Sequence, residues 1–169
     1  MDGYLLDTNA ASILWDMRNR EYKTLRSFIQ KIDQSPIWIS IVVFGEIEYG
    51  LKTAPRMDER LQADVRKKMS FFPLVLEMDK HTVEPYSDLR AALFKKYSPK
   101  DKRGRLKAKW PEDLRERTTA KELGVQENDI WIAAQAVQYN LVLVSSDYMR
   151  RLQEVSTDLD YPLQLASWK

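Results

Sequence analysis

The chain has 169 residues, which is enough for one domain with its own hydrophobic core. It carries 27 Lys and Arg residues against 25 Asp and Glu, and a net charge of +2 is too small to indicate nucleic-acid binding by itself. The lack of cysteine excludes disulfides, thiolate zinc sites and Cys nucleophiles, while the single histidine, His81, argues against Ser-His-Asp catalysis and multi-His zinc sites.

Five short apolar runs predict strands, with helical patterns between them. The runs are Gly3–Leu6, Ile37–Ile41, Leu74–Met78, Leu141–Val144 and Leu163–Ala166. The first four are continuous rather than alternating, which is typical of strands covered by helices on both faces. The alternation of strands and helices predicts an α/β fold with a central parallel sheet and right-handed crossovers.

The helices are predicted from apolar periodicity and from capping residues. Thr8 or Asn9 can cap the first helix, Ser40 is the expected cap of another, and Asn128 is the expected cap of the helix with the clearest apolar stripe. The later predicted helices cover Thr24–Ile32, Val42–Lys52, Asp58–Ser70, Thr82–Lys96 and Asn128–Tyr139.

A basic segment, Lys95–Lys109, interrupts this alternation with eight bases and one acid, Asp101. Trp110 follows, and Pro111 predicts a short helix through Leu123. A solvated loop, a contact for an acidic protein and a contact for a phosphate backbone are all compatible with the segment. We treat residues 98–121 as a basic insertion in a single domain of residues 1–169. Its candidate RNA contacts are Lys100, Lys102, Arg103, Arg105, Lys107, Lys109 and Trp110.

Two acids directly follow predicted strands. Asp7 comes after the first strand, and Asp147 comes after the fourth, following Ser145 and Ser146. Ligands of open α/β sheets bind at the carboxyl ends of the strands. The ordinary alternatives are that Asp7 caps the next helix and that Asp147 is an acid at a helix start.

Two further acids lie on predicted helices. Glu46 shares a helix face with Val43 and Gly50, and a half-buried carboxylate there is costly unless it meets a cation. Gly50 is expected to permit close backbone approach. Asp129 has an ordinary role as a first-turn acid, but it also borders the buried face of its helix.

All four acids can converge on one point, where they would repel one another unless cations neutralise them. Because oxygen ligands suit hard cations, the sequence predicts Mg²⁺ or Mn²⁺ at Asp7, Glu46, Asp129 and Asp147. His81 is expected at the surface, and the tryptophans other than Trp110 are expected to pack in the interior.

Five blocks in order resemble a PIN domain and, within that superfamily, a VapC-type toxin ribonuclease. They are Leu5-Leu6-Asp7-Thr8-Asn9, Ser40 through Glu46 to Gly50, Glu127 through Ala136, Val144-Ser145-Ser146-Asp147 and the ending Leu163 to Trp168. Ser145 stands where Thr is commoner. The resemblance covers the chain apart from roughly residues 98–121, and the basic insertion makes it longer than a minimal toxin.

The resemblance implies a three-layer α/β/α fold with strand order 3-2-1-4-5. It implies RNA phosphodiester hydrolysis with one or two Mg²⁺ or Mn²⁺ ions held by the four acids. It also implies that Asn9 and Ser145 orient ligands, water or phosphate. It also implies a homodimer and a cognate antitoxin.

Two alternatives remain open from the sequence. One is a PIN-like nuclease that acts on DNA or structured flaps, and the other is a catalytically silent module that binds RNA or protein. The N-terminus shows no signal-peptide pattern and no apolar run approaches the length of a membrane span, so a cytoplasmic location is expected.

Overall fold

The computed structural model describes residues 2–32, 34–56, 58–107, 110–116, 119–146 and 149–169. In this part of the chain, a sheet is formed by β1 (Tyr4–Leu6), β2 (Ile37–Ser40), β3 (Val75–Leu76), β4 (Val142–Val144) and β5 (Gln164–Ala166). The strand order is β3-β2-β1-β4-β5, which confirms the expected topology. All neighbouring strands are parallel, so their carboxyl ends lie at one edge.

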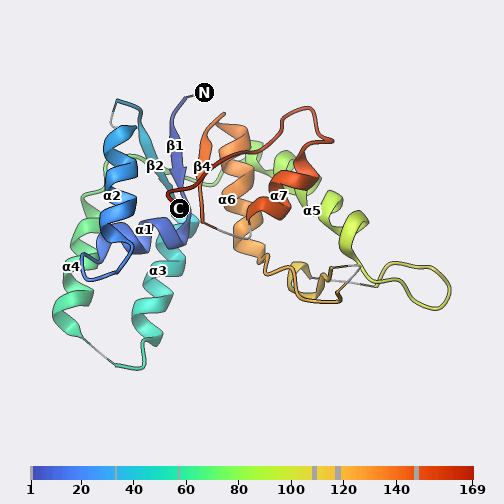
Figure 1. The fold of residues 1–169 in the computed structure, drawn as a ribbon, viewed down its shortest axis with the longest axis horizontal. Coiled ribbons are helices and arrows are strands. Elements are labelled where there is room, and N and C mark those ends of the chain that lie inside the picture. The colour runs from blue at the N-terminus through green and yellow to red at the C-terminus, as the bar shows by residue number, and fades with distance from the viewer. Residues whose placement is uncertain (1, 33, 57, 108–109, 117–118, 147–148) are drawn as a thin grey trace.

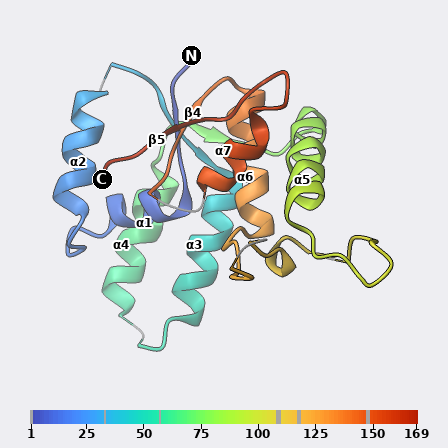
Figure 2. The ribbon, with the colours of Figure 1, turned by 45° about the vertical axis from the view of Figure 1, so that its right-hand side comes forward.

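Helices cover both faces of this sheet. Figures 1 and 2 show α1, α2 and α4 to one side of β1 and α5 and α6 to the other, which confirms the three-layer α/β/α fold. The helices are α1 (Thr8–Trp15), α2 (Tyr22–Lys31), α3 (Ile41–Thr53), α4 (Glu59–Ser70), α5 (Val83–Tyr97), α6 (Glu127–Gln138) and α7 (Met149–Ser156), with 3₁₀ turns η1 (Lys80–Thr82) and η2 (Pro111–Asp113).

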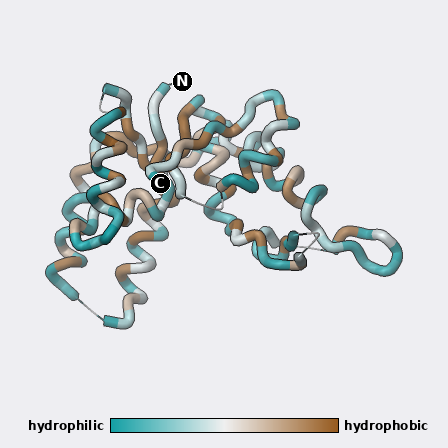
Figure 3. The backbone as a smooth tube through the Cα atoms, in the orientation of Figure 1, coloured by the Kyte–Doolittle hydropathy of each residue, from teal (hydrophilic) through white to brown (hydrophobic). Residues whose placement is uncertain are grey.

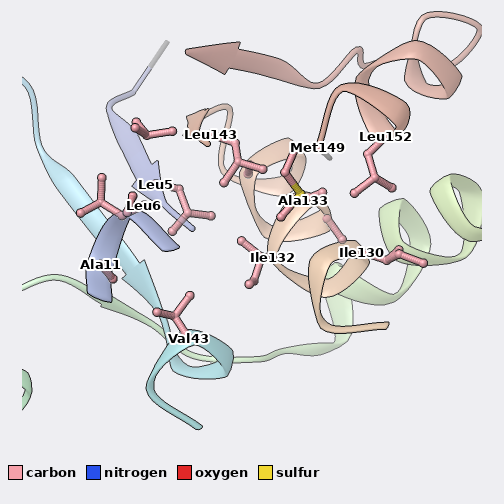
Figure 4. Packing of buried hydrophobic residues seen from close by; sticks show 14 of the residues in the cluster. Leu5, Leu6, Ala11, Val43, Ile130, Ile132, Ala133, Leu143, Met149 and Leu152 are labelled. Carbon is pink, nitrogen blue, oxygen red and sulfur yellow. The ribbon is translucent and has the colours of Figure 1, made fainter. Parts of the chain in front are cut away.

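The core joins the central strands to α6. Leu5 of β1, Leu143 of β4 and Ile132 of α6 are fully buried and point toward one another (Figure 4). Burying side chains of this kind stabilises the fold by about 1.5–3 kcal/mol each relative to exposure. This packing holds α6 against β1, the strand that immediately precedes Asp7.

The predicted helix from Pro111 through Leu123 is wrong. The helical turn ends at Asp113, and Arg115 then forms an antiparallel bridge with Glu122. This fold-back buries both Leu114 and Leu123. Within the described residues, no helix has the length and apolar character to cross a membrane.

A cluster of ion pairs ties α7 to α5. The Glu154 carboxylate accepts hydrogen bonds from Lys96 Nζ at 2.7 Å, from the Tyr97 hydroxyl at 2.7 Å and from Arg151 Nη1 at 3.1 Å. Arg151 also contacts Glu116, in the segment before α6. The bonds from Lys96, Tyr97 and Arg151 hold the pKa of Glu154 down to about 2. The cluster therefore fixes α7 relative to α5.

We expect Glu154→Gln to destabilise the fold at pH 7 by about 1 kcal/mol or less, because the Glu154 side chain is 43% exposed and water screens its ion pairs. In the folded state the Glu154 carboxyl has a pKa below its ordinary value of 4.5. The stability that the ionised carboxylate contributes is therefore complete above pH 4.5 and is lost as the pH falls through about 2. Urea unfolding at pH 7 and pH 3, with Asp158→Asn as the control, measures this. A stability difference that does not shrink at pH 3 would contradict the expectation.

Candidate active site

A pocket of about 400 Å³ opens where β1 ends. Three of the four predicted acids, Asp7, Glu46 and Asp129, line it together. The fourth, Asp147, lies outside the described residues, as does Lys109 among the candidate RNA contacts. The other lining residues are Thr8, Asn9, Ser12, Gly124, Gln126 and Met149.

Hydrogen bonds to β4 and to the first turn of α1 hold Asp7 at the end of β1. Its backbone N–H donates to the Val144 carbonyl at 3.1 Å, and its Oδ1 accepts from the Ala10 N–H at 2.6 Å. Asp7 therefore caps α1 itself, and the prediction that Thr8 or Asn9 provides the cap is wrong. The side chain is 4% exposed, so a buried carboxylate stands in the pocket wall.

The Glu46 carboxylate accepts hydrogen bonds from residues at the starts of α1 and α6. Its Oε1 accepts from Asn128 Nδ2 at 3.1 Å, and its Oε2 accepts from the Thr8 hydroxyl. These neutral donors stabilise a half-buried carboxylate without neutralising its charge. The expectation about Gly50 is wrong, because a Cβ added there would meet nothing within 4 Å.

The helix that carries Glu46 begins as predicted. Ser40 ends β2 and its Oγ accepts from the Val42 N–H at 3.0 Å. This cap confirms the predicted start of α3. Glu46 therefore lies on the second turn of a helix that begins at the carboxyl edge of the sheet.

Asp129 lies in the first turn of α6. The cap of this helix is Gln126 rather than the predicted Asn128, and Asp129 Oδ2 accepts from the Gln126 N–H at 2.8 Å. The small residues Ala133 and Ala136 are fully buried further along α6. Asn128 instead reaches across to Glu46, a role that the sequence did not reveal.

A polar cluster anchors the start of α6 to α5. Glu127 Oε1 accepts from Arg90 Nη1 at 2.8 Å and from the Tyr86 hydroxyl. The Tyr86 ring stacks on Trp131, with ring centroids 3.6 Å apart and an angle of 8° between the planes. Burial, followed by the Glu127 carboxylate, raises the pKa of Tyr86, so its hydroxyl stays protonated as a donor. This cluster holds the helix that presents Asp129 to the pocket and Asn128 to Glu46.

Asn9 and Ser145 lie close to the acids. Asn9 lines the pocket and its Nδ2 donates to Ser146 Oγ at 3.1 Å. Because Leu6 of β1 pairs with Val144 of β4, Asp7 and Ser145 leave adjacent strands side by side. Ser145 is 5% exposed, and its Oγ has no hydrogen-bond partner among the described residues.

The donor chemistry of the pocket suits a hard cation. The side-chain oxygens that line the pocket are carboxylate, hydroxyl and amide oxygens, which Mg²⁺ and Mn²⁺ prefer. The buried Ser145 hydroxyl lies outside this lining, directly after β4, the strand that pairs with β1. Across the residues that the structure describes, no group of three His, Asp or Glu side chains stands close enough to hold a metal ion. Each of Asp7, Glu46 and Asp129 is bonded to protein donors instead.

Several remaining residues lie as the sequence suggested. His81 is exposed in η1. Trp15 and Trp168 are buried in the core, Trp38 and Trp131 are partly buried and pack against it, and Trp110 is 53% exposed.

Comparisons with known proteins agree with the fold. The family model described as the PIN domain matches residues 4–156. No curated protein sequence matches the chain significantly.

Solved structures share the fold at low sequence identity. DNA-bound VapBC from Salmonella typhimurium has a TM-score of 0.66 at 20% identity, covering 100% of both chains. VapBC-1 from nontypeable Haemophilus influenzae has a TM-score of 0.62 at 22% identity, covering 98% of this chain and 97% of that one. VapBC-5 from Mycobacterium tuberculosis, a member of the VapBC family of toxin-antitoxin systems, has a TM-score of 0.52 at 16% identity, covering 99% and 98%.

Proposed function

The chain belongs to the PIN domain family, and from this membership we propose that it is a metal-dependent endoribonuclease that hydrolyses RNA phosphodiester bonds. One observation carries the proposal: Asp7, Glu46 and Asp129, from three separate elements, line a single pocket at the carboxyl edge of the sheet. Carboxylates brought together in this way repel one another, and a divalent cation relieves that repulsion.

In this proposal Asp7, Glu46 and Asp129 hold one or two Mg²⁺ or Mn²⁺ ions, together with Asp147. When bound, the cation would act as a Lewis acid that activates water and stabilises negative charge on the leaving oxygen. Thr8 and Asn128 fix the Glu46 carboxylate for this task. Asn9 and Ser145 would orient ligands, water or the scissile phosphate.

We further propose that the protein is the toxin of a toxin–antitoxin pair, acts in the cytoplasm, forms a homodimer and is silenced by a cognate antitoxin. The support is the shared fold with VapBC structures, among them VapBC-5, a member of the VapBC family of toxin-antitoxin systems. At identities of 16–22% these structural similarities show a shared fold. Binding of a cognate antitoxin is tested separately, by co-purification of the two proteins.

The catalytic proposal is tested with the purified chain and matched single-stranded RNA and DNA of one sequence. We expect cleavage of the RNA in Mg²⁺ or Mn²⁺, no cleavage in EDTA, and little cleavage of the DNA. Equal cleavage in EDTA would exclude the metal mechanism. Preferred cleavage of DNA would favour the DNA nuclease, and metal binding without cleavage of either strand would favour a silent binding module.

A further inference from the structure

The segment between α5 and α6 forms a projecting arm, which we call the basic hairpin (residues 100–107). Lys100 and Leu106 form an antiparallel bridge, and the Lys107 N–H donates to the Pro99 carbonyl at 2.8 Å. Figures 1 and 2 show the hairpin extending from the body, beyond the segment that leads into α6, and Figure 3 shows that it is mostly hydrophilic.

Asp101, the acid of the hairpin, forms its hydrogen bonds within the turn of the hairpin. Asp101 accepts hydrogen bonds from the backbone N–H groups of Arg103 and Arg105 at 2.8 and 2.9 Å, and from Arg105 Nε at 2.9 Å. These bonds, led by the Arg105 backbone, hold the pKa of Asp101 below its usual range. The Asp101 side chain is 14% exposed, so the hairpin presents cations to the solvent rather than its carboxylate.

Four of these cations form no ion pair with any residue in the described ranges: Lys100, Lys102, Arg103 and Lys107. All four are exposed. The other long basic side chains nearby are different, because Arg105 is paired with Asp101 and Lys96 is paired with Glu154. The hairpin therefore concentrates unneutralised positive charge at its tip and along its sides.

An exposed aromatic residue follows the hairpin in the sequence, before Gly124 and Gln126 of the pocket. Trp110 is 53% exposed, and the Arg90 guanidinium lies 5.9 Å from the centroid of its ring. Two residues later, Glu112 Oε1 accepts from the Glu127 N–H at 3.1 Å, at the start of α6. This contact fastens the base of the segment to the helix that carries Asp129.

The described lining of the pocket has no positively charged side chain that could bind a phosphate backbone. Its described lining residues include three acids and no Lys or Arg. A bound cation offsets the charge of the acids, but attraction for the rest of a polyanion must come from elsewhere. The basic hairpin supplies such charge, and Trp110 offers a face on which an unpaired base can stack.

We propose that the basic hairpin and Trp110 hold the single-stranded RNA that extends out of the pocket. This inference rests on the proposed function and names its substrate contact outside the catalytic carboxylates. Single-stranded RNA is favoured over an acidic protein because the cations accompany an exposed aromatic ring, and over duplex because only unpaired bases can stack on a side chain.

The test measures RNA binding by the full chain in EDTA, so that it does not depend on cleavage. One variant carries K100Q, K102Q, R103Q and K107Q, which leaves the Asp101 turn intact. A matched control carries K23Q, K31Q, R60Q and K67Q, which removes the same charge from exposed positions on α2 and α4, on the other side of the molecule (Figure 1). The probes are a labelled 20-nucleotide single-stranded RNA and labelled poly-glutamate.

We expect the hairpin variant to bind the RNA at least about 10-fold more weakly than the control in low salt. The slope of log K against log salt should become shallower by about 3, because each lost phosphate contact contributes about 0.7 for a single strand. Trp110→Leu should weaken RNA binding by about 10-fold, and Trp110→Phe should restore most of it. Thermal melts confirm that each variant is folded.

Equal RNA affinity and equal salt slopes in the hairpin and control variants would overturn the inference. So would loss of poly-glutamate binding with RNA binding retained, which would assign the hairpin to an acidic protein. A wild-type chain that binds RNA through the hairpin but cleaves nothing in Mg²⁺ or Mn²⁺ would support this inference while overturning the proposed function.

Discussion

Asp7→Asn is expected to reduce RNA cleavage by at least about 100-fold, a loss of about 2.7 kcal/mol of transition-state stabilisation. Asparagine keeps the size of the side chain and an oxygen that can accept from the Ala10 N–H, so the cap of α1 survives. It removes the negative charge that a divalent cation would require. The free energy of unfolding should therefore change by less than about 1 kcal/mol.

The matched control is Asp58→Asn. Asp58 caps α4 by accepting from the Leu61 N–H at 3.0 Å, so the same chemical change falls on a helix cap that does not line the acid pocket. Initial cleavage rates and urea unfolding are measured for both variants. Loss of activity in both, or retained activity in Asp7→Asn, would refute the role given to Asp7.

Removal of Glu46 is expected to abolish the stabilisation of the folded chain by divalent metal. At a free Mn²⁺ concentration of 100 times Kd, a cation that binds the folded state alone stabilises it by about 2.7 kcal/mol. For a chain of this size that corresponds to a rise in Tm of roughly 5–10 °C. In Glu46→Gln the rise should fall to less than about 2 °C, because a neutral amide is a much poorer ligand.

Glu48→Gln provides the control for this prediction. Glu48 lies two residues further along α3, where it pairs with Arg66 at 2.9 Å and with Lys52 at 3.5 Å. Its replacement shifts the metal-free Tm by breaking these pairs, but the increment produced by Mn²⁺ should persist. Thermal melts with Mn²⁺ and with EDTA give both quantities. An increment that survives in Glu46→Gln would place the cation elsewhere.

The fold was predictable because its main signals are local. The continuous runs ending at Leu6 and Val144 are buried on both faces, and such runs are read directly from the sequence. The insertion was not predictable by the same means. Pro111 can start either an α-helix or a single 3₁₀ turn, and long-range burial of Leu114 and Leu123 decided between them.

The candidate site was predictable in its charged residues but not in the bonds that hold them. Asp7, Glu46 and Asp129 follow from strand ends and helix faces, and they do meet at one pocket. The bond between Asn128 and Glu46 joins residues that are 82 positions apart, so no local pattern reveals it. The caps of α1 and α6 were misplaced because several neighbouring polar residues can cap a helix, and Asp7 and Gln126 do so here.

Direct titration with Mn²⁺, followed by the electron paramagnetic resonance signal of the free ion, tests the central claim most directly. Wild-type chain is compared with Asp7→Asn at equal concentration, under the conditions used for RNA cleavage. We expect the wild-type chain to deplete the free-ion signal and Asp7→Asn to leave most of it. Equal depletion by both proteins, or no depletion by a wild-type chain that is cleaving RNA, would contradict a metal site built around Asp7.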